Sequence, residues 1–292
     1  MSSSEFSTPD RFPVFTKRWH NKAYSTISPK RPENSALGKV VIVTGGGTGI
    51  GAAIAKCFAE AGAAGIGLIG RREEQLKSTS KTISSVSSTT KIVYAVADVT
   101  EKESLEAAFR QFAETLGKTD VLVSNAGYFS RGDLSSADGE DWWRSFEVNV
   151  KGSFNTIQAF LPNSKPNAAV LSVSASLLHL QPAVPGVSRY IISKMASARL
   201  HECLQIEHPE LQVVSVHPGI VESAMTEKFG ALGMDEPELV AGLMVWLSGP
   251  EAGFLKGKYL WANWDVDELK ERASEIEESK LLELALLGPA RL

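Results

Sequence analysis

From Lys39 onward, short continuous apolar runs alternate with longer segments whose apolar residues recur at helical spacing. The runs are KVVIVTG, AGIGLIG, KIVYAVAD, DVLVSNAG, AVLSVSA and LQVVSVHPG, and the helical segments cover 49–62, 72–84, 101–116, 140–160, 188–207 and 235–248. Because the runs are apolar on both faces, they favour a parallel sheet covered by helices on both sides. We therefore predict an α/β protein with a single doubly wound domain over residues 37–264.

The two ends of the chain depart from this pattern. Residues 1–36 are rich in Ser, Pro and Lys/Arg, so we predict an extended N-terminal arm without a core of its own. The arm is expected to pack along the body because it carries Phe12, Phe15, Trp19 and Tyr24. Residues 265–292 are predicted to form one amphipathic helix and a tail, since Asp265 and Glu268 have capping-box spacing and a Gly-Pro stop signal follows at 288–289.

Composition and charge narrow the class of protein. Hydrophobic residues make up 43% and charged residues 22% of the chain, which is ordinary globular usage. With a formal net charge of -4, the chain has no overall positive charge to attract nucleic acid or an anionic membrane, so neither is an expected partner. Two cysteines, Cys57 and Cys203, and five scattered histidines predict neither a disulfide framework nor a metal site. With no apolar stretch of membrane-span length and no secretory signal pattern, we predict a soluble cytoplasmic protein.

The first apolar run leads directly into a glycine-rich turn, TGGGTGIG at 44–51, which opens an alanine-rich helix. Glycines permit a tight turn and a close approach to a pyrophosphate, while the free N–H groups of a helix N-terminus bind its negative charge. A lone glycine cluster is usually a plain turn, but this position predicts dinucleotide binding. The residues assigned to this contact are Gly45, Gly47, Thr48, Gly49, Ile50 and Gly51.

The end of the second run predicts which dinucleotide is bound. An acidic residue there would bond the ribose 2'-hydroxyl of NAD. This run instead ends IGRR, and the guanidinium groups of Arg71 and Arg72 can fork onto a 2'-phosphate. NADP is therefore favoured over NAD. The alternative is that both arginines are solvated at a helix start, with Glu73 or Glu74 turning back to the ribose.

Two further strand ends are candidates for cofactor contact. Asp98 could accept a hydrogen bond from an adenine amino group, with Val99 against the ring, although an N-cap for the next helix explains Asp98 equally well. Asn125, Ala126 and Gly127 end the fourth run, where small residues would leave room for a sugar beside the sheet. Alone, this tripeptide could be simply a turn.

Tyr190 and Lys194 are the candidate catalytic pair. They lie four residues apart at the start of a helix and so share a face. An ammonium near a phenol favours the phenolate and lowers its pKa from about 10 toward working pH, which gives a general acid/base. Because such a pair is common by chance, the pair alone would indicate only surface packing.

The order of the motifs makes the pair specific. TGGGTGIG, NAG, Asn149 within EVNV, a serine-rich strand end, YIISK and HPG occur in one order, which resembles the short-chain dehydrogenase/reductase family over about residues 38–264. The flanks FTKRWHNKAYSTISPKRP and WANWDVDELK resemble a branch of that family common in filamentous fungi. The resemblance implies a Rossmann-like fold and a homodimer or homotetramer.

The resemblance also implies roles for individual residues. Tyr190 would exchange a proton with the substrate oxygen, Lys194 would assist it while bonding the nicotinamide ribose, and Asn149 would hold a water in the proton relay. The segment after the HPG motif would flank the nicotinamide, and Ser223 stands where many relatives have Thr. In this segment the positions assigned to the cofactor are Pro218, Gly219, Val221 and Ser223.

The serine run departs from the family pattern. Members usually end this strand with a Ser-Ser pair whose second member binds the substrate oxygen, but here direct alignment places Ala175 there. Ser174 and Ser176 lie on the same side of an extended chain, so either could reach in if the strand end is bent. Ser174 is slightly favoured. The alternative is that no serine polarises the carbonyl and activity is low or absent.

These observations predict an NADP-dependent oxidoreductase that interconverts an alcohol and a ketone on a small molecule. The alternative is a member with a non-redox role, as an isomerase, a cyclase or a cofactor-binding scaffold. Two segments, 177–189 and 222–236, are expected to set substrate identity. Their apolar residues favour a lipophilic substrate such as one of secondary metabolism, and they are Leu177, Leu178, Leu180, Met225, Phe229, Leu232 and Met234.

Overall fold

The computed structural model describes residues 12, 14–180 and 184–285. Seven parallel strands form one sheet in the order β3-β2-β1-β4-β5-β6-β7. The chain therefore winds outward in both directions from β1, which confirms the predicted doubly wound arrangement. The strands are β1 Val40–Thr44, β2 Gly65–Gly70, β3 Lys91–Val96, β4 Thr119–Ser124, β5 Ser164–Val173, β6 Gln212–His217 and β7 Tyr259–Trp261.

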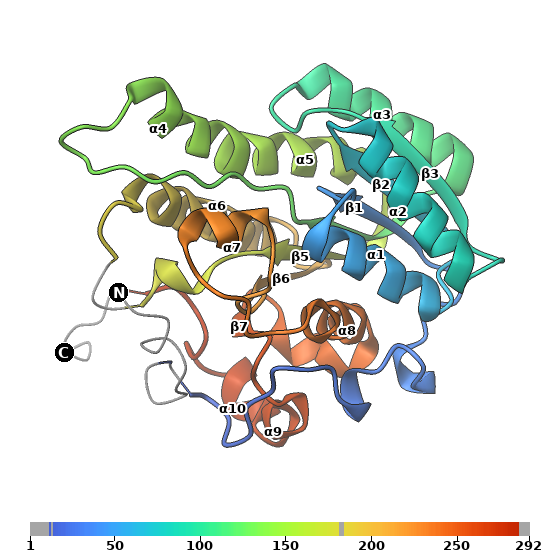
Figure 1. Ribbon diagram of the computed structural model, residues 1–292. Coiled ribbons are helices and arrows are strands. Elements are labelled where there is room, and N and C mark those ends of the chain that lie inside the picture. Colours follow the sequence, from blue (N-terminus) through green and yellow to red (C-terminus); the bar gives the residue numbers. More distant parts are fainter. Residues whose placement is uncertain (1–11, 13, 181–183, 286–292) are drawn as a thin grey trace.

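Helices cover both faces of the sheet (Figure 1), as the continuous apolar strands predict. Residues of α1, α2 and α8 pack on one face, and residues of α3, α5 and α6 pack on the other. The α-helices are α1 Gly49–Glu60, α2 Glu73–Val86, α3 Lys102–Leu116, α4 Gly139–Phe146, α5 Gly152–Phe160, α6 Ser188–Glu207, α7 Ala224–Phe229, α8 Pro237–Leu247, α9 Val266–Glu271 and α10 Ala273–Glu277. Short 3-10 turns lie at Ser25–Ile27, Pro32–Asn34, Leu161–Asn163, Ser176–Leu178 and Pro250–Leu255, and a π-helical turn at Glu147–Lys151 joins α4 to α5.

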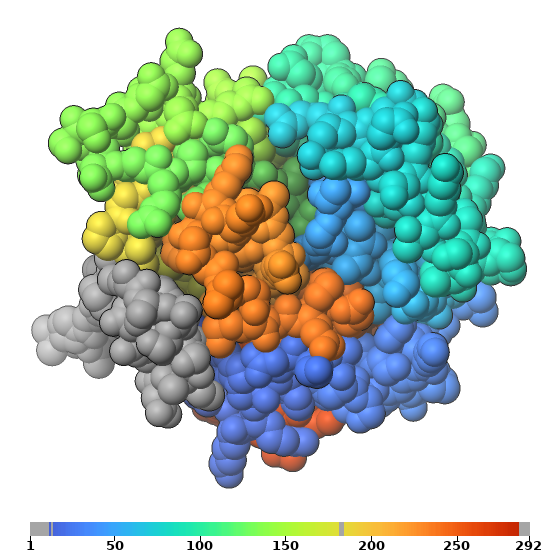
Figure 2. Space-filling model, in the orientation of Figure 1, coloured from blue at the N-terminus to red at the C-terminus, as the bar shows by residue number. Residues whose placement is uncertain are grey.

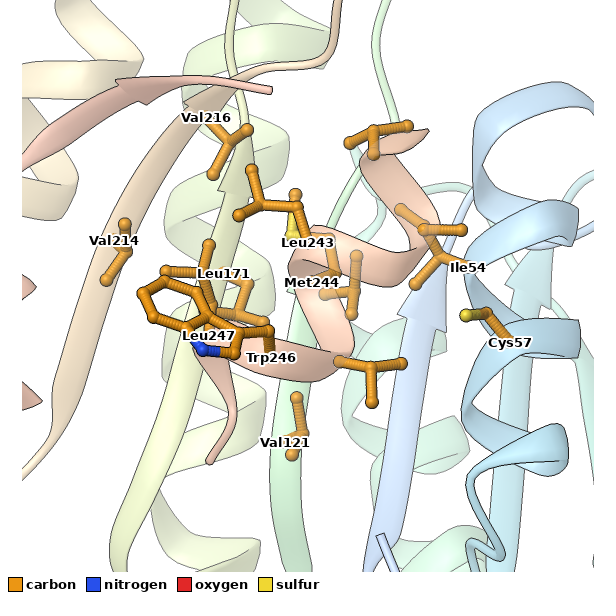
Figure 3. Packing of buried hydrophobic residues seen from close by; sticks show 14 of the residues in the cluster. Ile54, Cys57, Val121, Leu171, Val214, Val216, Leu243, Met244, Trp246 and Leu247 are labelled. Carbon is orange, nitrogen blue, oxygen red and sulfur yellow. The ribbon is translucent and has the colours of Figure 1, made fainter. Parts of the chain in front are cut away.

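Alternate side chains of each central strand enter different cores. In β1, Val41 and Val43 join the core that contains α8, whereas Val40 and Ile42 join the core that contains α3. Helix α8 is buried from residue 239 to its end at residue 247, and Figure 3 shows its side chains between the strands and α1. Because the apolar residues of the central strands are buried under helices on both faces, the ends of these strands are fixed relative to one another, and the polar side chains begin there.

The N-terminal arm and the C-terminal segment pack against each other and against α8. In Figure 1 the dark blue arm runs beneath α8 to α9 and α10. Its aromatic residues join the large core, and Trp19 pairs with Trp264 in an antiparallel bridge. Residues 1–11 and 13 of the predicted arm lie outside the described residues.

The prediction of one closing helix is wrong. Arg272, with φ -107 and ψ 17, separates α9 from α10. Its guanidinium lies 3.9 Å from the centre of the Phe15 ring and donates to the Phe15 carbonyl at 3.1 Å, so a contact with the arm holds this residue outside helical geometry. Asp265 does cap α9, but the Glu268 carboxylate binds arm amides instead of completing a capping box. The predicted stop signal at 288–289 lies outside the described residues.

Candidate active site

A cleft of about 510 Å³ lies at the carboxyl ends of the strands, where the direction of winding changes. The glycine turn, the ends of β2 to β5, the start of α6 and the helix α7 line it, and Figure 2 shows the orange surface of α7 beside the blue surface around α1. The predicted site residues that line this cleft are Gly45, Gly47, Thr48, Gly49, Ile50, Gly51, Arg71, Arg72, Asp98, Val99, Asn125, Ala126, Gly127, Ser174, Tyr190, Lys194, Pro218 and Ser223. Asn149, Ser176, Gly219 and Val221 do not line it.

The glycine turn forms a tight cradle that only glycine permits. Gly45 and Gly49 have φ of +66 and +53, in the left-handed region. A side chain on Gly51 would place its Cβ 2.4 Å from the carbonyl oxygen of Gly45. Asn125 ties the turn to β4, because its Nδ2 donates to the carbonyl of Thr44 at 2.9 Å. The turn therefore holds the N-terminus of α1 open toward the cleft, which fits an anionic pyrophosphate.

The arginine pair lies at one end of the cleft. Arg71 is 3.7 Å from Asp98, and its side chain is 63% exposed, so the guanidinium can change partner. Glu73 and Glu74 pair with Lys77 and do not line the cleft. The alternative in which one of these carboxylates turns back to a ribose is therefore not observed. This end of the cleft therefore offers two cations to an anionic ligand.

Asp98 binds within its own turn. Its Oδ1 accepts from the backbone N of Thr100 at 3.0 Å and from the Thr100 hydroxyl at 2.9 Å. The N-cap of α3 is Glu101, so the alternative explanation of Asp98 as that N-cap is not observed. The second carboxylate oxygen lies between Arg71 and Arg144, 3.7 and 3.6 Å away. Asp98 therefore presents a fixed acceptor at the cleft.

Tyr190 and Lys194 lie on the first turns of α6 and are both buried. The Lys194 Nζ donates to the carbonyl of Val173 at 2.8 Å, and the Tyr190 hydroxyl lies 3.8 Å from the sulfur of Met225. Burial lowers the pKa of Lys194 from 10.5 to about 8. Burial also raises the pKa of Tyr190, so the expected lowering by Lys194 is not seen in the chain alone. Burial therefore favours the neutral phenol over the phenolate.

Asn149 lies in the π-helical turn behind this pair and is 1% exposed. Its Oδ1 accepts from the backbone N of Tyr128 at 2.8 Å, and its Nδ2 donates to the Tyr128 carbonyl and to the Ser193 hydroxyl, each at 2.9 Å. A Cβ on Gly127 would lie 3.4 Å from this Oδ1 and 3.5 Å from the Lys194 Nζ. Asn149 therefore fixes the loop after β4 beside Lys194, while its side chain bonds protein groups.

The two serines have different surroundings. Ser174 lines the cleft, and its buried hydroxyl has no hydrogen-bond partner among the described residues. Ser176 begins a 3-10 turn outside the lining, where its backbone N donates to Nδ1 of His217 at 3.1 Å. Only Ser174 therefore brings a free buried hydroxyl to the cleft that contains Tyr190.

An apolar cluster covers Tyr190. The Phe129 ring packs edge-on against Tyr190 with centroids 5.1 Å apart and against Phe229 at 5.6 Å. Leu177 and Met225 join this cluster, whereas Leu178 and Leu180 pack into the large core and Leu232 is 72% exposed. The sequence analysis missed Phe129, Tyr128 and Lys228, which also line the cleft. Phe129 is the second residue after the NAG motif, so proximity to that motif was the available signal.

The doubly wound fold, the glycine cradle and the Tyr-Lys pair together define a Rossmann-type oxidoreductase site. Among the described residues, no three His, Cys, Asp or Glu side chains could jointly hold a metal ion. Across the same residues, no helix has both the length and the apolar character that a bilayer crossing requires.

Comparison with known proteins identifies the family. The family model for short chain dehydrogenase matches residues 39–231, so the chain belongs to that family of oxidoreductases. Short chain dehydrogenase citE of Monascus ruber is 32% identical, over 94% of this chain and 97% of the relative. A dehydrogenase/reductase from Sinorhizobium meliloti 1021 is 31% identical with a TM-score of 0.73, over 79% of this chain and 95% of that one. A short chain dehydrogenase from Burkholderia cenocepacia J2315 in complex with NADP is 26% identical with a TM-score of 0.72, over 80% and 99% of the chains.

Proposed function

We propose that the protein is an NADP-dependent oxidoreductase that interconverts an alcohol and a ketone on a lipophilic small molecule of secondary metabolism. The observation that carries the proposal is the cleft itself. Tyr190, Lys194 and the free hydroxyl of Ser174 line the same cleft as the glycine cradle. One ligand spanning the cleft would therefore touch both the anion-binding end and the proton donor.

The proposed cofactor is NADP, which when bound supplies or accepts the hydride. The glycine turn and the α1 N-terminus would hold its pyrophosphate, and Arg71 and Arg72 would bind the 2'-phosphate. Asp98, with Val99, and the residues Asn125 to Gly127 would contact the adenosine and the sugars. Lys194 would bond the nicotinamide ribose. The NADP complex of the Burkholderia relative supports this choice of cofactor.

The chain's own residues would move the proton. Ser174 Oγ would donate a hydrogen bond to the substrate oxygen and stabilise its developing charge. Tyr190 Oη, held protonated by burial, would give its proton to that oxygen during reduction and take it back during oxidation. Phe129, Met225 and Phe229 would exclude water and hold an apolar substrate over the tyrosine. Asn149 would hold the loop after β4 in place beside the tyrosine–lysine pair through its two hydrogen bonds to the backbone of Tyr128.

The proposal includes a cytoplasmic homo-oligomer. Large apolar side chains are exposed on neighbouring helices, with Trp143 on α4 61% exposed, Phe154 on α5 45% exposed and Met195 on α6 44% exposed. An apolar face of this kind is typical of a surface that a second subunit covers.

The test measures NADPH oxidation in the presence of each of a panel of lipophilic ketones, monitored as the loss of NADPH absorbance. Turnover with NADPH and a preference over NADH are expected. Tight NADPH binding without turnover on any ketone or alcohol would favour the alternative, a non-redox isomerase, cyclase or scaffold. No binding of either dinucleotide would refute the cofactor assignment.

A further inference from the structure

Asp235 lies between α7 and α8 and joins three distant parts of the chain. The residue is 9% exposed. Oδ1 accepts from Nδ2 of Asn21 at 2.6 Å and from Nδ2 of Asn263 at 2.8 Å, and Oδ2 accepts from the backbone N of Ile220 at 2.6 Å. All three partners are donors, which matches an acceptor-only carboxylate. A single buried side chain therefore connects the arm, the segment after β7 and the loop after β6.

The loop at 218–223 touches the cleft on one side and Asp235 on the other. Pro218 and Ser223 line the cleft. On the opposite side, the backbone N atoms of residues 234 and 235 donate to the Ile220 carbonyl at 2.8 and 3.2 Å. Gly219 has φ of +86, and a Cβ there would lie 2.6 Å from Oδ2 of Asp235. The loop is thus fastened from behind, and glycine at 219 permits the close approach.

The arm is fastened to the same point. The backbone N of Glu236 donates to the Asn21 carbonyl at 2.9 Å. Asn263, 1% exposed, accepts at its carbonyl from the backbone N of His20 at 2.8 Å and donates from its Nδ2 to the His20 carbonyl at 2.8 Å. The amide that holds His20 also binds Asp235. The arm therefore contacts the Asp235 carboxylate in two ways, directly through Asn21 and indirectly through the Asn263 amide that binds His20.

We propose that Asn21 and Asp235 are positioning residues through which the N-terminal arm fixes the 218–223 loop against the cofactor cleft. The inference rests on the proposed function, because the ligand that benefits is the dinucleotide. A loop that is already fixed loses less conformational entropy when it meets a ligand, so binding is tighter. The arm thus contributes to cofactor binding without lining the cleft.

The chain offers a matched control for this proposal. The hydroxyl of Thr26 donates to the Asp267 carboxylate at 2.6 Å, so it also joins the arm to the C-terminal segment by a hydrogen bond to a carboxylate. Asp267 bonds no residue of the 218–223 loop in the part of the chain that the structure describes. Asn21→Ala and Thr26→Ala should therefore loosen the arm alike, while only the first releases the loop.

The first measurement is hydrogen exchange of the Ile220 amide in the protein without cofactor. Asn21→Ala should speed this exchange by about tenfold, the effect of losing one hydrogen bond to a charged group, and Thr26→Ala should leave it unchanged. Asn21→Leu keeps a similar side-chain volume but has no donor and adds no charge beside Asp235, so it replaces Asn21→Ala if the alanine variant does not fold.

The second measurement is NADPH kinetics on the same variants. Asn21→Ala should raise the KM for NADPH about fivefold and leave kcat at saturating NADPH within about twofold. Thr26→Ala should change neither KM nor kcat, although both variants should lower Tm by a similar amount. Unchanged exchange at Ile220 in both Asn21 variants, or equal changes in Thr26→Ala, would overturn the proposal. Because the exchange experiment needs no cofactor, it decides whether the arm fixes the 218–223 loop even if the protein fails to bind NADP, a result that would refute the proposed function.

Discussion

Replacing Ser174 by alanine should make the protein more stable and less active. The backbone at this position is fixed independently of the side chain, because its N donates to the Val216 carbonyl at 2.7 Å. The side chain is 5% exposed and its hydroxyl has no partner among the described residues. A buried hydroxyl without a partner costs about 1 to 3 kcal/mol. Its removal should raise the free energy of unfolding by about 1 kcal/mol, after allowance for lost packing.

The same substitution should lower turnover by about 100-fold. If Ser174 Oγ stabilises the developing charge on the substrate oxygen, alanine removes one donor, and such losses cost about 2.7 to 4 kcal/mol in the transition state. A substitution that raises stability but lowers turnover indicates that the polar group is present for function and not for folding.

Urea unfolding and single-turnover kinetics on purified variants provide the assay. Ser176→Ala is the control, since its contact with His217 is through the main chain and survives the substitution. This control should keep turnover within about twofold and gain no stability. The reasoning fails if Ser174→Ala unfolds more easily than the parent or retains full turnover. Loss of turnover in Ser176→Ala alone would transfer the role to that serine.

Four other predictions concern the cleft and the exposed helices. Tyr190→Phe should bind NADP about as well as the parent yet lose at least about 100-fold in turnover by stopped flow, and turnover above a few per cent would contradict the acid/base role. Because burial lowers the pKa of Lys194 from 10.5 to about 8, the unfolded chain binds more protons at this residue between these values. The stability of the parent relative to Lys194→Met should therefore rise with pH in that window, as urea unfolding of both proteins at several pH values will check. Arg71→Asp with Arg72→Ser should weaken NADP much more than NAD in fluorescence titration, and an unchanged affinity ratio would reject the 2'-phosphate assignment. Trp143→Asp should shift sedimentation toward the monomer, whereas an unaltered oligomer would place the interface elsewhere.

The sheet could be predicted because its information is local. Runs such as KVVIVTG are apolar on both faces, and the structure buries all five residues of β1. The glycine turn could be predicted for the same reason, because the strand, the glycines and the helix follow one another directly in the sequence. A strand of only three residues, β7, carries too little pattern to be distinguished from a loop.

The missed features depend on distant contacts. The segment 140–160 reads as one helix, but five residues at 147–151 form a π-helical turn that places Asn149 behind the site. In the sequence Asp235 reads as the first residue of the helical segment 235–248, and its role is not visible there because its partner Asn21 is 214 residues away. Arg272 breaks the closing helix through a contact with Phe15, which the local amphipathic pattern does not contain.

The contact between the two ends of the chain also fixes an order of events during synthesis. His20 bonds Asp265, a partner that lies 245 residues later, so the arm must wait for the synthesis of a much later segment before this contact can form. At about 5 to 20 residues per second, this wait lasts roughly 10 to 50 s. The sheet from β1 to β6 can form meanwhile, while the aromatic side chains of the arm stay uncovered. We expect a nascent chain stalled before residue 265 to be the form that chaperones bind, and the finished chain to bury that surface within one docking step.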